Sequence, residues 1–302
     1  MVSQVEFVVE GATVRGRLFA PNGKRPAPGI VMAPGFTATS HFAVFESYAR
    51  GIAKIGVAVL LIDMRGFGSS DGEPRYQINP WAQARDYRAA IDFLRATDGV
   101  DPNRVGVWGV SLSAAIASVV AATDNGVAAA VLLVPAFGDE MSPLDPAGAG
   151  FESIRTIVVD ADLGSFDRTT SDPLPVVSPT QMSAPSLLES LTAYHWFINS
   201  GARFGTEWAN QATIARLDTP TPFDAQACVP HIAAPTLMLI AEQDEMEGAD
   251  ADVAREVFAQ APQNKEQVAV EGGHFGILYN NSTDFERSLA VQQRFLQEHL
   301  LT

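Results

Sequence analysis

Short apolar runs alternate with longer amphipathic segments along most of the chain. The apolar runs predict strands at residues 29–33, 57–62, 105–110, 128–134, 234–240 and 267–270, since none is long enough for a helix. Helical spacing predicts helices at residues 41–55, 79–96, 113–122 and 251–260, and a final helix opened by a capping box at residues 283–286. Near the N-terminus, alternation at residues 5–9 and 13–19 predicts an antiparallel hairpin, followed by a turn-rich link at residues 21–28. This order predicts an α/β fold, with a mostly parallel sheet of about eight strands covered by helices on both faces.

The stretch from residue 137 to residue 232 interrupts the alternation. It lies between two predicted strands and is far too long for a loop in a compact domain. Helical pieces are predicted near residues 186–200 and 208–217. We therefore expect a core formed by residues 1–136 and 233–302, with residues 137–232 inserted as a helical cap.

Composition and charge narrow the classes of function. The 302 residues carry 35 acidic and 20 basic side chains, a net charge of −15 at pH 7. A surface this acidic disfavours a nucleic-acid partner. No apolar run approaches the roughly 18–20 residues of a membrane span, so no membrane partner is expected. The N-terminal residues lack the pattern of a signal peptide, and the expected location is the cytoplasm.

The cysteine and histidine content speaks against disulfide and metal chemistry. Cys228 is the only cysteine, which excludes an intrachain disulfide. No group of His, Cys or carboxylate residues has the spacing of a metal site, so neither a metal nor another cofactor is predicted. The expected partner is a small-molecule substrate, and a homodimer is compatible with the sequence.

A candidate nucleophile lies where a predicted strand turns into a predicted helix. The segment Gly109-Val-Ser111-Leu-Ser113 has small residues two positions before and two positions after Ser111, as a sharp strand-to-helix turn requires. Such a turn presents the central hydroxyl at the carboxyl edge of the sheet. Ser113 stands in a similar pattern, but the apolar strand ends at Val110, which favours Ser111.

The candidate base and acid follow two later strands. His274 comes directly after the last predicted strand, between glycines, and is preferred to His41 as the base. The remaining histidines are His195, His231 and His299, which lie in or beside the predicted cap or on the last helical turn. Asp244 follows the preceding strand and is the candidate that orients the imidazole, with Asp139 as the alternative. The order Ser111, Asp244, His274 is the nucleophile–acid–histidine order of one hydrolase fold.

Acyl-transfer chemistry also needs N–H donors for the oxyanion. The N–H of Leu112, directly after the nucleophile, is one candidate. The other is expected in the loop after residues 29–33, on Phe36 or on Thr37, because Pro34 has no N–H. Thr37 is in either case expected beside the substrate.

The predicted cap carries aromatic residues within a short stretch, namely Tyr194, Trp196, Phe197, Phe204 and Trp208. Most of them are expected to form the core of the cap. Tyr194, Trp196 and Phe197 are the candidates to face the sheet, where they would line an apolar pocket for an acyl or aromatic group.

Four ordered motifs resemble the α/β-hydrolase superfamily. They are Pro34-Gly35-Phe36, Asp63-Met-Arg65-Gly66-Phe-Gly68-Ser-Ser-Asp-Gly72, Gly109-Val-Ser111-Leu-Ser113, and Asp244 with Gly273-His274. The second motif is similar to that of esterases and peptidases of the dienelactone-hydrolase, X-prolyl-peptidase and cocaine-esterase groups, and residues 208–225 resemble uncharacterised bacterial hydrolases of that neighbourhood. In these families Asp63 and Arg65 would tie loops beneath the site. Pro34 and Ser113 depart from the pattern, since the superfamily usually carries His and Gly there.

The resemblance implies a serine hydrolase that cleaves a carboxylic ester, or a thioester, lactone or amide, through an acyl-enzyme on Ser111. One alternative is acyl transfer, cyclisation or C–C bond cleavage on the same fold. Another is a ligand-binding protein without catalysis, against which the complete set of Ser111, Asp244 and His274 speaks.

Overall fold

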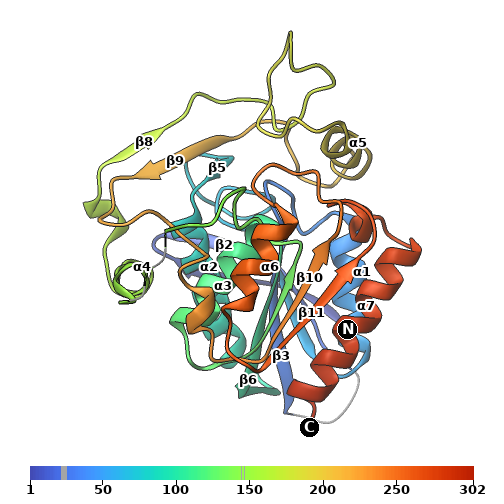
Figure 1. The fold of residues 1–302 in the computed structure, drawn as a ribbon. Helices are drawn as coiled ribbons and strands as arrows, with labels where there is room; N and C mark the ends of the chain where they lie inside the picture. The colour runs from blue at the N-terminus through green and yellow to red at the C-terminus, as the bar shows by residue number, and fades with distance from the viewer. Residues whose placement is uncertain (22–25, 144, 146) are drawn as a thin grey trace.

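A central sheet organises the structure, a computed structural model that describes residues 1–21, 26–143, 145 and 147–302 (Figure 1). Its eight strands are β1 (Val2–Val9), β2 (Ala12–Phe19), β3 (Ala27–Ala33), β4 (Ala58–Ile62), β6 (Val100–Val110), β7 (Val127–Leu133), β10 (Thr236–Ala241) and β11 (Lys265–Val270), in the order β1-β2-β4-β3-β6-β7-β10-β11. The pairs β1–β2 and β2–β4 are antiparallel and the remaining pairs are parallel. The predicted α/β sheet is confirmed, whereas half of the link predicted at residues 21–28, residues 22–25, lies outside the described residues.

Helices cover both faces of this sheet. α1 (Ala43–Lys54) and α7 (Thr283–Leu300) pack on one face, and α2 (Pro80–Arg95), α3 (Leu112–Thr123) and α6 (Ala251–Ala259) lie on the other (Figure 1). α3 is buried from Ser113 to Ala122 because it is enclosed by the sheet, by α2 and by α4 (Ala149–Val159). Its Ala-rich sequence suits this position, since a closely packed interior leaves no space for larger side chains.

Three strands of the sheet are buried along their whole length. β3, β4 and β10 are buried throughout, which explains their continuous apolar sequences. β6 begins at Val100 rather than at residue 105, because Val100 already pairs with Ala27 of β3 before an irregularity between Ala27 and Gly29. The carboxyl ends of these parallel strands meet at one edge, where the loops of the candidate site begin.

The start of α7 differs by one residue from the prediction. The capping box at residues 283–286 implied Thr283 as the capping residue. In the structure the cap is Ser282, whose hydroxyl oxygen accepts a hydrogen bond of 3.0 Å from the N–H of Phe285. Serine is the better N-cap of the two, which agrees with a cap at Ser282.

The chain between β7 and β10 occupies two regions. α4 contacts α2 and α3 beside the sheet. β8 (Arg168–Thr170), α5 (Leu191–Ser200) and β9 (Thr213–Leu217) lie beyond the carboxyl ends of the parallel strands (Figure 1). β9 pairs with β8 and with β5 (Gln77–Ile78), a two-residue strand after β4. Short helical turns complete the elements: η1 (Leu163–Ser165), η2 (Val229–His231) and η3 (Gly276–Leu278).

Within this insertion the prediction is partly wrong. The helix predicted near residues 186–200 is present as α5. The helix predicted at 208–217 is not, since residues 213–217 form β9. Its backbone hydrogen bonds come from β5 and β8, which are distant in sequence, so local spacing could not reveal them. α4 was not predicted.

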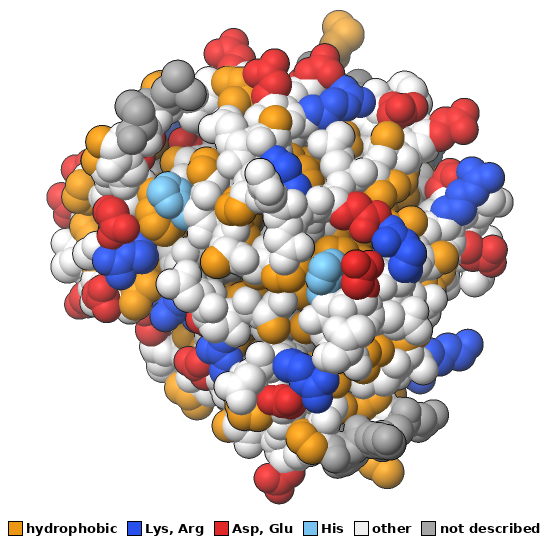
Figure 2. All heavy atoms as spheres, turned by 60° about the horizontal axis from the view of Figure 1, so that its bottom comes forward, with side chains coloured by type: hydrophobic (Ala, Val, Ile, Leu, Met, Phe, Trp, Pro, Cys, Tyr) orange, Lys and Arg blue, Asp and Glu red, His pale blue; other side chains and the backbone are white. Residues whose placement is uncertain are grey.

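The acidic surface shows no single concentrated patch on the face that Figure 2 presents. Acidic side chains there are scattered among neutral ones, and basic side chains lie close to several of them. Arg–carboxylate pairs among the described residues include Arg15–Asp71, Arg17–Glu46, Arg95–Asp124, Arg104–Asp101, Arg155–Glu152, Arg255–Asp252 and Arg294–Glu266.

Candidate active site

Ser111 lies in a strained turn between β6 and α3. Its backbone angles are φ 57° and ψ −124°, a conformation that residues other than glycine rarely adopt. The surrounding backbone fixes it: the Ser111 N–H donates to the Leu133 carbonyl at 2.9 Å, and the Ser111 carbonyl accepts from the N–H of Ala136 at 3.1 Å. The turn closes only over small residues, because a Cβ at Gly109 would lie 2.2 Å from the Ser113 carbonyl oxygen.

Ser113, the rival nucleophile, is part of the turn's internal structure. Its side chain is buried, and its hydroxyl oxygen accepts from the N–H of Val110 at 2.8 Å. The hydroxyl lies equally close, 2.8 Å, to the carbonyl oxygen of Ala33, to which it donates. Ser113 thus joins the ends of β6 and β3, which accounts for a serine at a position where the resembled superfamily usually has glycine.

Asp244 and His274 form a buried pair. The Asp244 Oδ2 atom lies 2.8 Å from His274 Nδ1, and their side chains are 2% and 3% exposed. The other oxygen, Oδ1, accepts from the Met246 N–H at 3.0 Å, which fixes the carboxylate. Because Nδ1 is occupied by the carboxylate, Nε2 is the ring nitrogen available for proton transfer.

The alternative acid, Asp139, and the other four histidines do not form such a buried pair with any described residue. Asp139 is exposed and accepts from the Gly248 N–H at 2.7 Å. His41 Nδ1 lies 3.7 Å from the buried carboxylate of Asp63. The rings of His231 and His299 pack on Phe151 and Phe295, and the side chain of His195 is exposed next to Tyr194.

The loop after β3 reaches the candidate nucleophile. A Cβ at Gly35 would lie 2.8 Å from the Val110 carbonyl oxygen and 3.2 Å from the Ser111 Cβ, so glycine allows this close approach. Among the described residues, the backbone N–H groups of Phe36 and Leu112 have no acceptor. Thr37 has φ 55° and is buried, and its hydroxyl oxygen lies 3.3 Å from Nε1 of Trp208, which donates to it from the insertion.

The aromatic residues of α5 join the insertion to the core. Trp196 is 2% exposed, stacks on Phe275 with ring centroids 5.1 Å apart, and donates from Nε1 to the Leu278 carbonyl at 3.0 Å. Phe197 is equally buried and packs on Trp208, with centroids 5.4 Å apart. These contacts place both side chains in the junction between α5 and the core, whereas Tyr194 is half-buried and Phe204 is fully exposed.

The loop after β4 holds other loops together. Asp63 is buried, and its carboxylate accepts from the N–H of Ser40 at 2.6 Å and from the N–H of Ser69 at 3.0 Å. Arg65 pairs with the buried Asp86 at 2.7 Å and with Glu10 at 2.8 Å. Burial raises the pKa of Asp86 to about 6, although the Arg65 guanidinium opposes this. The observed contacts of Asp63 and Arg65 are thus of the structural kind that the resemblance implied.

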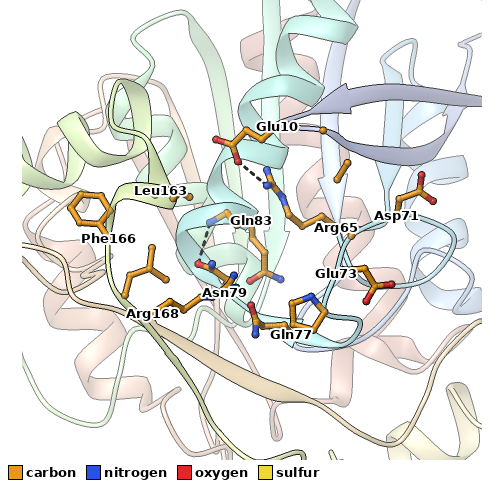
Figure 3. A pocket seen from close by; sticks show the side chains of 18 residues that line it. Glu10, Arg65, Asp71, Glu73, Gln77, Asn79, Gln83, Leu163, Phe166 and Arg168 are labelled. Atoms are coloured by element: carbon orange, nitrogen blue, oxygen red, sulfur yellow. Dashed lines mark hydrogen bonds and ion pairs between the residues drawn. The ribbon is translucent and has the colours of Figure 1, made fainter.

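A polar cavity of about 690 Å³ lies beside this loop (Figure 3). It is enclosed by the β1–β2 turn, the start of α2 and the segment from η1 to β8, with side chains of Glu10, Arg65, Gln83 and Arg168 in its wall. Ser111, Asp244 and His274 are not among its lining residues. This cavity is therefore separate from the candidate active site.

Sequence reasoning did not identify Glu245 as a site residue. Its Oε2 atom accepts from the backbone N–H of His274 at 2.9 Å, and its Oε1 atom accepts from the hydroxyl of Thr192 on α5. A Cβ at Gly273 would lie 2.1 Å from Glu245 Oε2. The glycine before His274 leaves room for this carboxylate and is the one signal in the sequence, but the carboxylate itself becomes visible only in the fold.

Within residues 1–21, 26–143, 145 and 147–302, no group of three or more His, Cys, Asp or Glu side chains is arranged to hold a metal ion. Over the same residues, no helix is long and apolar enough to cross a membrane.

Comparisons with known proteins agree with this architecture. A thiohydrolase from Eupenicillium brefeldianum is 26% identical over 97% of this chain and 93% of that protein. The thiohydrolase aneE from Aspergillus aculeatus is 40% identical over 47% of this chain and 45% of that protein. The chain thus spans less than half the length of the curated relatives that it matches at 40–41% identity.

A solved structure and a family model extend the comparison to most of the chain. The crystal structure of the alpha/beta hydrolase GrgF from Penicillium sp. sh18 covers all of both chains with a TM-score of 0.74, and at 24% identity this shows the shared fold. Residues 30–285 match the model described as the alpha/beta hydrolase family. The chain therefore belongs to the alpha/beta hydrolase family.

Proposed function

We propose that this protein is a serine hydrolase that cleaves a thioester, or a carboxylic ester, of a small and mainly apolar acyl group. The observation that carries the proposal is the buried Asp244–His274 pair at 2.8 Å, together with the strained turn at Ser111. The choice of thioester is supported by the relative named thiohydrolase that aligns over 97% of the chain.

Ser111 is the nucleophile in this mechanism. Its Oγ attacks the carbonyl carbon while His274 Nε2 takes its proton, and Asp244 stabilises the imidazolium that forms. The oxyanion accepts hydrogen bonds from the N–H groups of Phe36 and Leu112. Each such donor contributes on the order of 10²–10³ in rate constant.

The first tetrahedral intermediate collapses when His274 gives its proton to the leaving thiol or alcohol, which leaves the acyl group on Ser111 Oγ. The acyl-enzyme then breaks down through the same groups. His274 takes a proton from water, which attacks the acyl carbon, and returns that proton to Ser111 Oγ as the acid is released. A base held by a buried carboxylate can serve both steps because its tautomer and orientation do not change between them.

Replacement of the two serines tests this assignment. Ser111→Ala should lower kcat for acyl thioesters and p-nitrophenyl esters by about 10⁴–10⁶-fold. It should also abolish covalent labelling by a fluorophosphonate. Ser113→Ala should keep the labelling and lose stability instead, because the N–H of Val110 loses its acceptor. An active Ser111→Ala enzyme together with an inactive but folded Ser113→Ala enzyme would contradict the proposal.

Acyl transfer to a second molecule is the other candidate. It is supported by relatives named polyketide transferase and acyltransferase, which are 40% and 38% identical over less than half of this chain. The same acyl-enzyme would serve, with an alcohol or amine in place of water. Product analysis with and without added alcohol separates the two reactions, since a transferase forms the new ester in preference to the acid.

A further inference from the structure

α5, together with its capping residue Ser190, contacts both loops that carry the candidate acid and base. On one side, Ser190 and Thr192 contact the loop after β10, through hydrogen bonds to the Met246 sulfur at 3.2 Å and to the carboxylate of Glu245. On the other side, Trp196 contacts the residues after His274. The insertion is thus attached at the two places where a change would displace His274.

Glu245 connects these parts directly. One carboxylate oxygen accepts from the His274 backbone N–H at 2.9 Å, and the other accepts from the Thr192 hydroxyl. The loop before His274 lies so close to this carboxylate that a Cβ at Gly273 would come within 2.1 Å of it. One side chain therefore links the loop after β10, the loop after β11 and α5.

The partners of Glu245 are hydrogen-bond donors without charge. Among the ion pairs of the described residues none includes Glu245. Its charge does act on the phenol of Tyr279, whose pKa is raised by burial and by this carboxylate. What His274 receives from Glu245 is a fixed position for its backbone, which a neutral acceptor could equally provide.

Trp196 contacts the loop after β11 on the C-terminal side of His274. Its ring stacks on Phe275, whose own ring packs edge-on against His274 with centroids 5.2 Å apart. Its Nε1–H donates to the carbonyl of Leu278 in η3. His274 is therefore flanked by two segments that both contact α5, one before the ring and one after it.

We infer that Glu245 and Thr192 are positioning residues, through which α5 of the insertion sets the geometry of His274 relative to Asp244 and Ser111. This inference rests on the proposed function. A base misplaced by a fraction of an ångström accepts the proton of Ser111 poorly, so the effect belongs to the chemical step rather than to substrate binding.

Variants of Glu245 test the acceptor. Glu245 and Thr192 are both exposed, so their replacement should leave the fold intact. Glu245→Ala should lower kcat about tenfold with KM changed less than about twofold, as loss of a supporting hydrogen bond does. Glu245→Gln should restore most of kcat, because its amide oxygen can accept from His274 and its amide N–H can donate to Thr192. A wild-type kcat in Glu245→Ala, or a Gln variant as slow as the Ala variant, overturns the inference.

Variants of Thr192 test the link to α5. Thr192→Val keeps the shape and removes the donor, and should lower kcat about threefold, whereas Thr192→Ser should restore it. Thr169→Val, an exposed threonine on β8, is the matched control and should behave as wild type. Adding Thr192→Val to Glu245→Ala should cause no further loss, since both act through one contact. Additive losses, or a Thr192→Val enzyme with wild-type kcat, overturn the role of α5.

A measurement without turnover separates this inference from the proposed function. The proton between His274 Nδ1 and Asp244 Oδ2 can be followed by NMR as a downfield signal. It should broaden or shift in Glu245→Ala and return in Glu245→Gln. An unchanged signal in Glu245→Ala overturns the positioning role even if the enzyme proves to be a hydrolase. An active Ser111→Ala enzyme overturns the proposed function instead, and leaves the NMR result standing.

Discussion

Ser111 and Ser113 are two positions apart and have opposite surroundings. The Ser113 hydroxyl is buried and bonded to backbone on two sides. Ser111 is half-exposed and has a backbone conformation that persists only because neighbouring N–H and carbonyl groups hold it. At the scale of single residues, Ser111 thus stays partly accessible to solvent while Ser113 does not.

Replacing each of the two candidate acids by asparagine should show from kcat which one orients His274. Asp244→Asn keeps the shape of the pair but allows the wrong tautomer of His274, so kcat should fall by about 10⁴-fold. Asp139→Asn should retain wild-type kcat, because Asp139 bonds only to the Gly248 N–H among the described residues. Initial rates on one ester at pH 7 decide the matter. A larger loss in Asp139→Asn would reverse the assignment.

Asp86 should make stability depend on pH in an unusual direction for a carboxylate. Burial raises its pKa to about 6, while an unfolded Asp titrates near 4. The stability that this group contributes is therefore complete below about pH 4 and is lost as the pH rises through about 6. Urea unfolding of wild type and Asp86→Asn across this range should show wild type losing stability relative to the variant. A difference that is constant, or that grows with pH, would contradict the raised pKa.

The elements of the core were predictable because each carries its own pattern. The continuous apolar runs of β4 and β10 and the apolar stripe of α1 are local properties of the sequence. β9 was not predictable, since a five-residue strand with mixed burial depends on partners far away in the chain. The same reason explains Glu245: acids are common in the loop after β10, and only the fold brings one of them to the His274 N–H.

The cap of α7 offers a test at the scale of one helix. Ser282→Ala removes the hydroxyl that accepts from Phe285 and should cost about 1 kcal/mol in the free energy of unfolding. Thr283→Ala, one residue later, should cost at most a few tenths of a kcal/mol, since alanine favours helix. Urea unfolding at one pH compares them directly. A larger loss in Thr283→Ala than in Ser282→Ala would place the cap at Thr283, as the sequence pattern predicted.

At the scale of the whole molecule, an aromatic cluster fastens the insertion to the core. Trp196 and Phe197 pack with Phe42 and Phe275, and all four side chains are buried. The sequence could predict that Ser111, Asp244 and His274 each lie in a loop after a strand, because those strands have recognisable apolar patterns. It could not predict which aromatic side chains fill the junction, since that depends on how α5 lies on α1 and η3.

Tyr194 is therefore the aromatic residue of α5 that we propose to contact substrate. Tyr194→Ala should change the preference among acyl chain lengths by on the order of tenfold, because one methylene in an apolar pocket is worth about 1–3 kcal/mol. Phe204→Ala is the control, since Phe204 is fully exposed in the same segment. Values of kcat/KM for p-nitrophenyl esters of graded length measure the effect. Identical profiles in the two variants would remove Tyr194 from the pocket.

The two-residue strand β5 has a consequence for any exchange of parts between relatives. Gln77 and Ile78 leave the core after β4 and pair with Thr213 and Ile214 of the insertion, and the Gln77 amide also donates to the Thr170 hydroxyl. A chimaera cut at residues 137 and 232 would therefore carry two strands of a three-stranded sheet and leave the third behind. The transplantable module consists of two separate pieces of chain, and sequence drift in the insertion is constrained by a loop that precedes it by more than fifty residues.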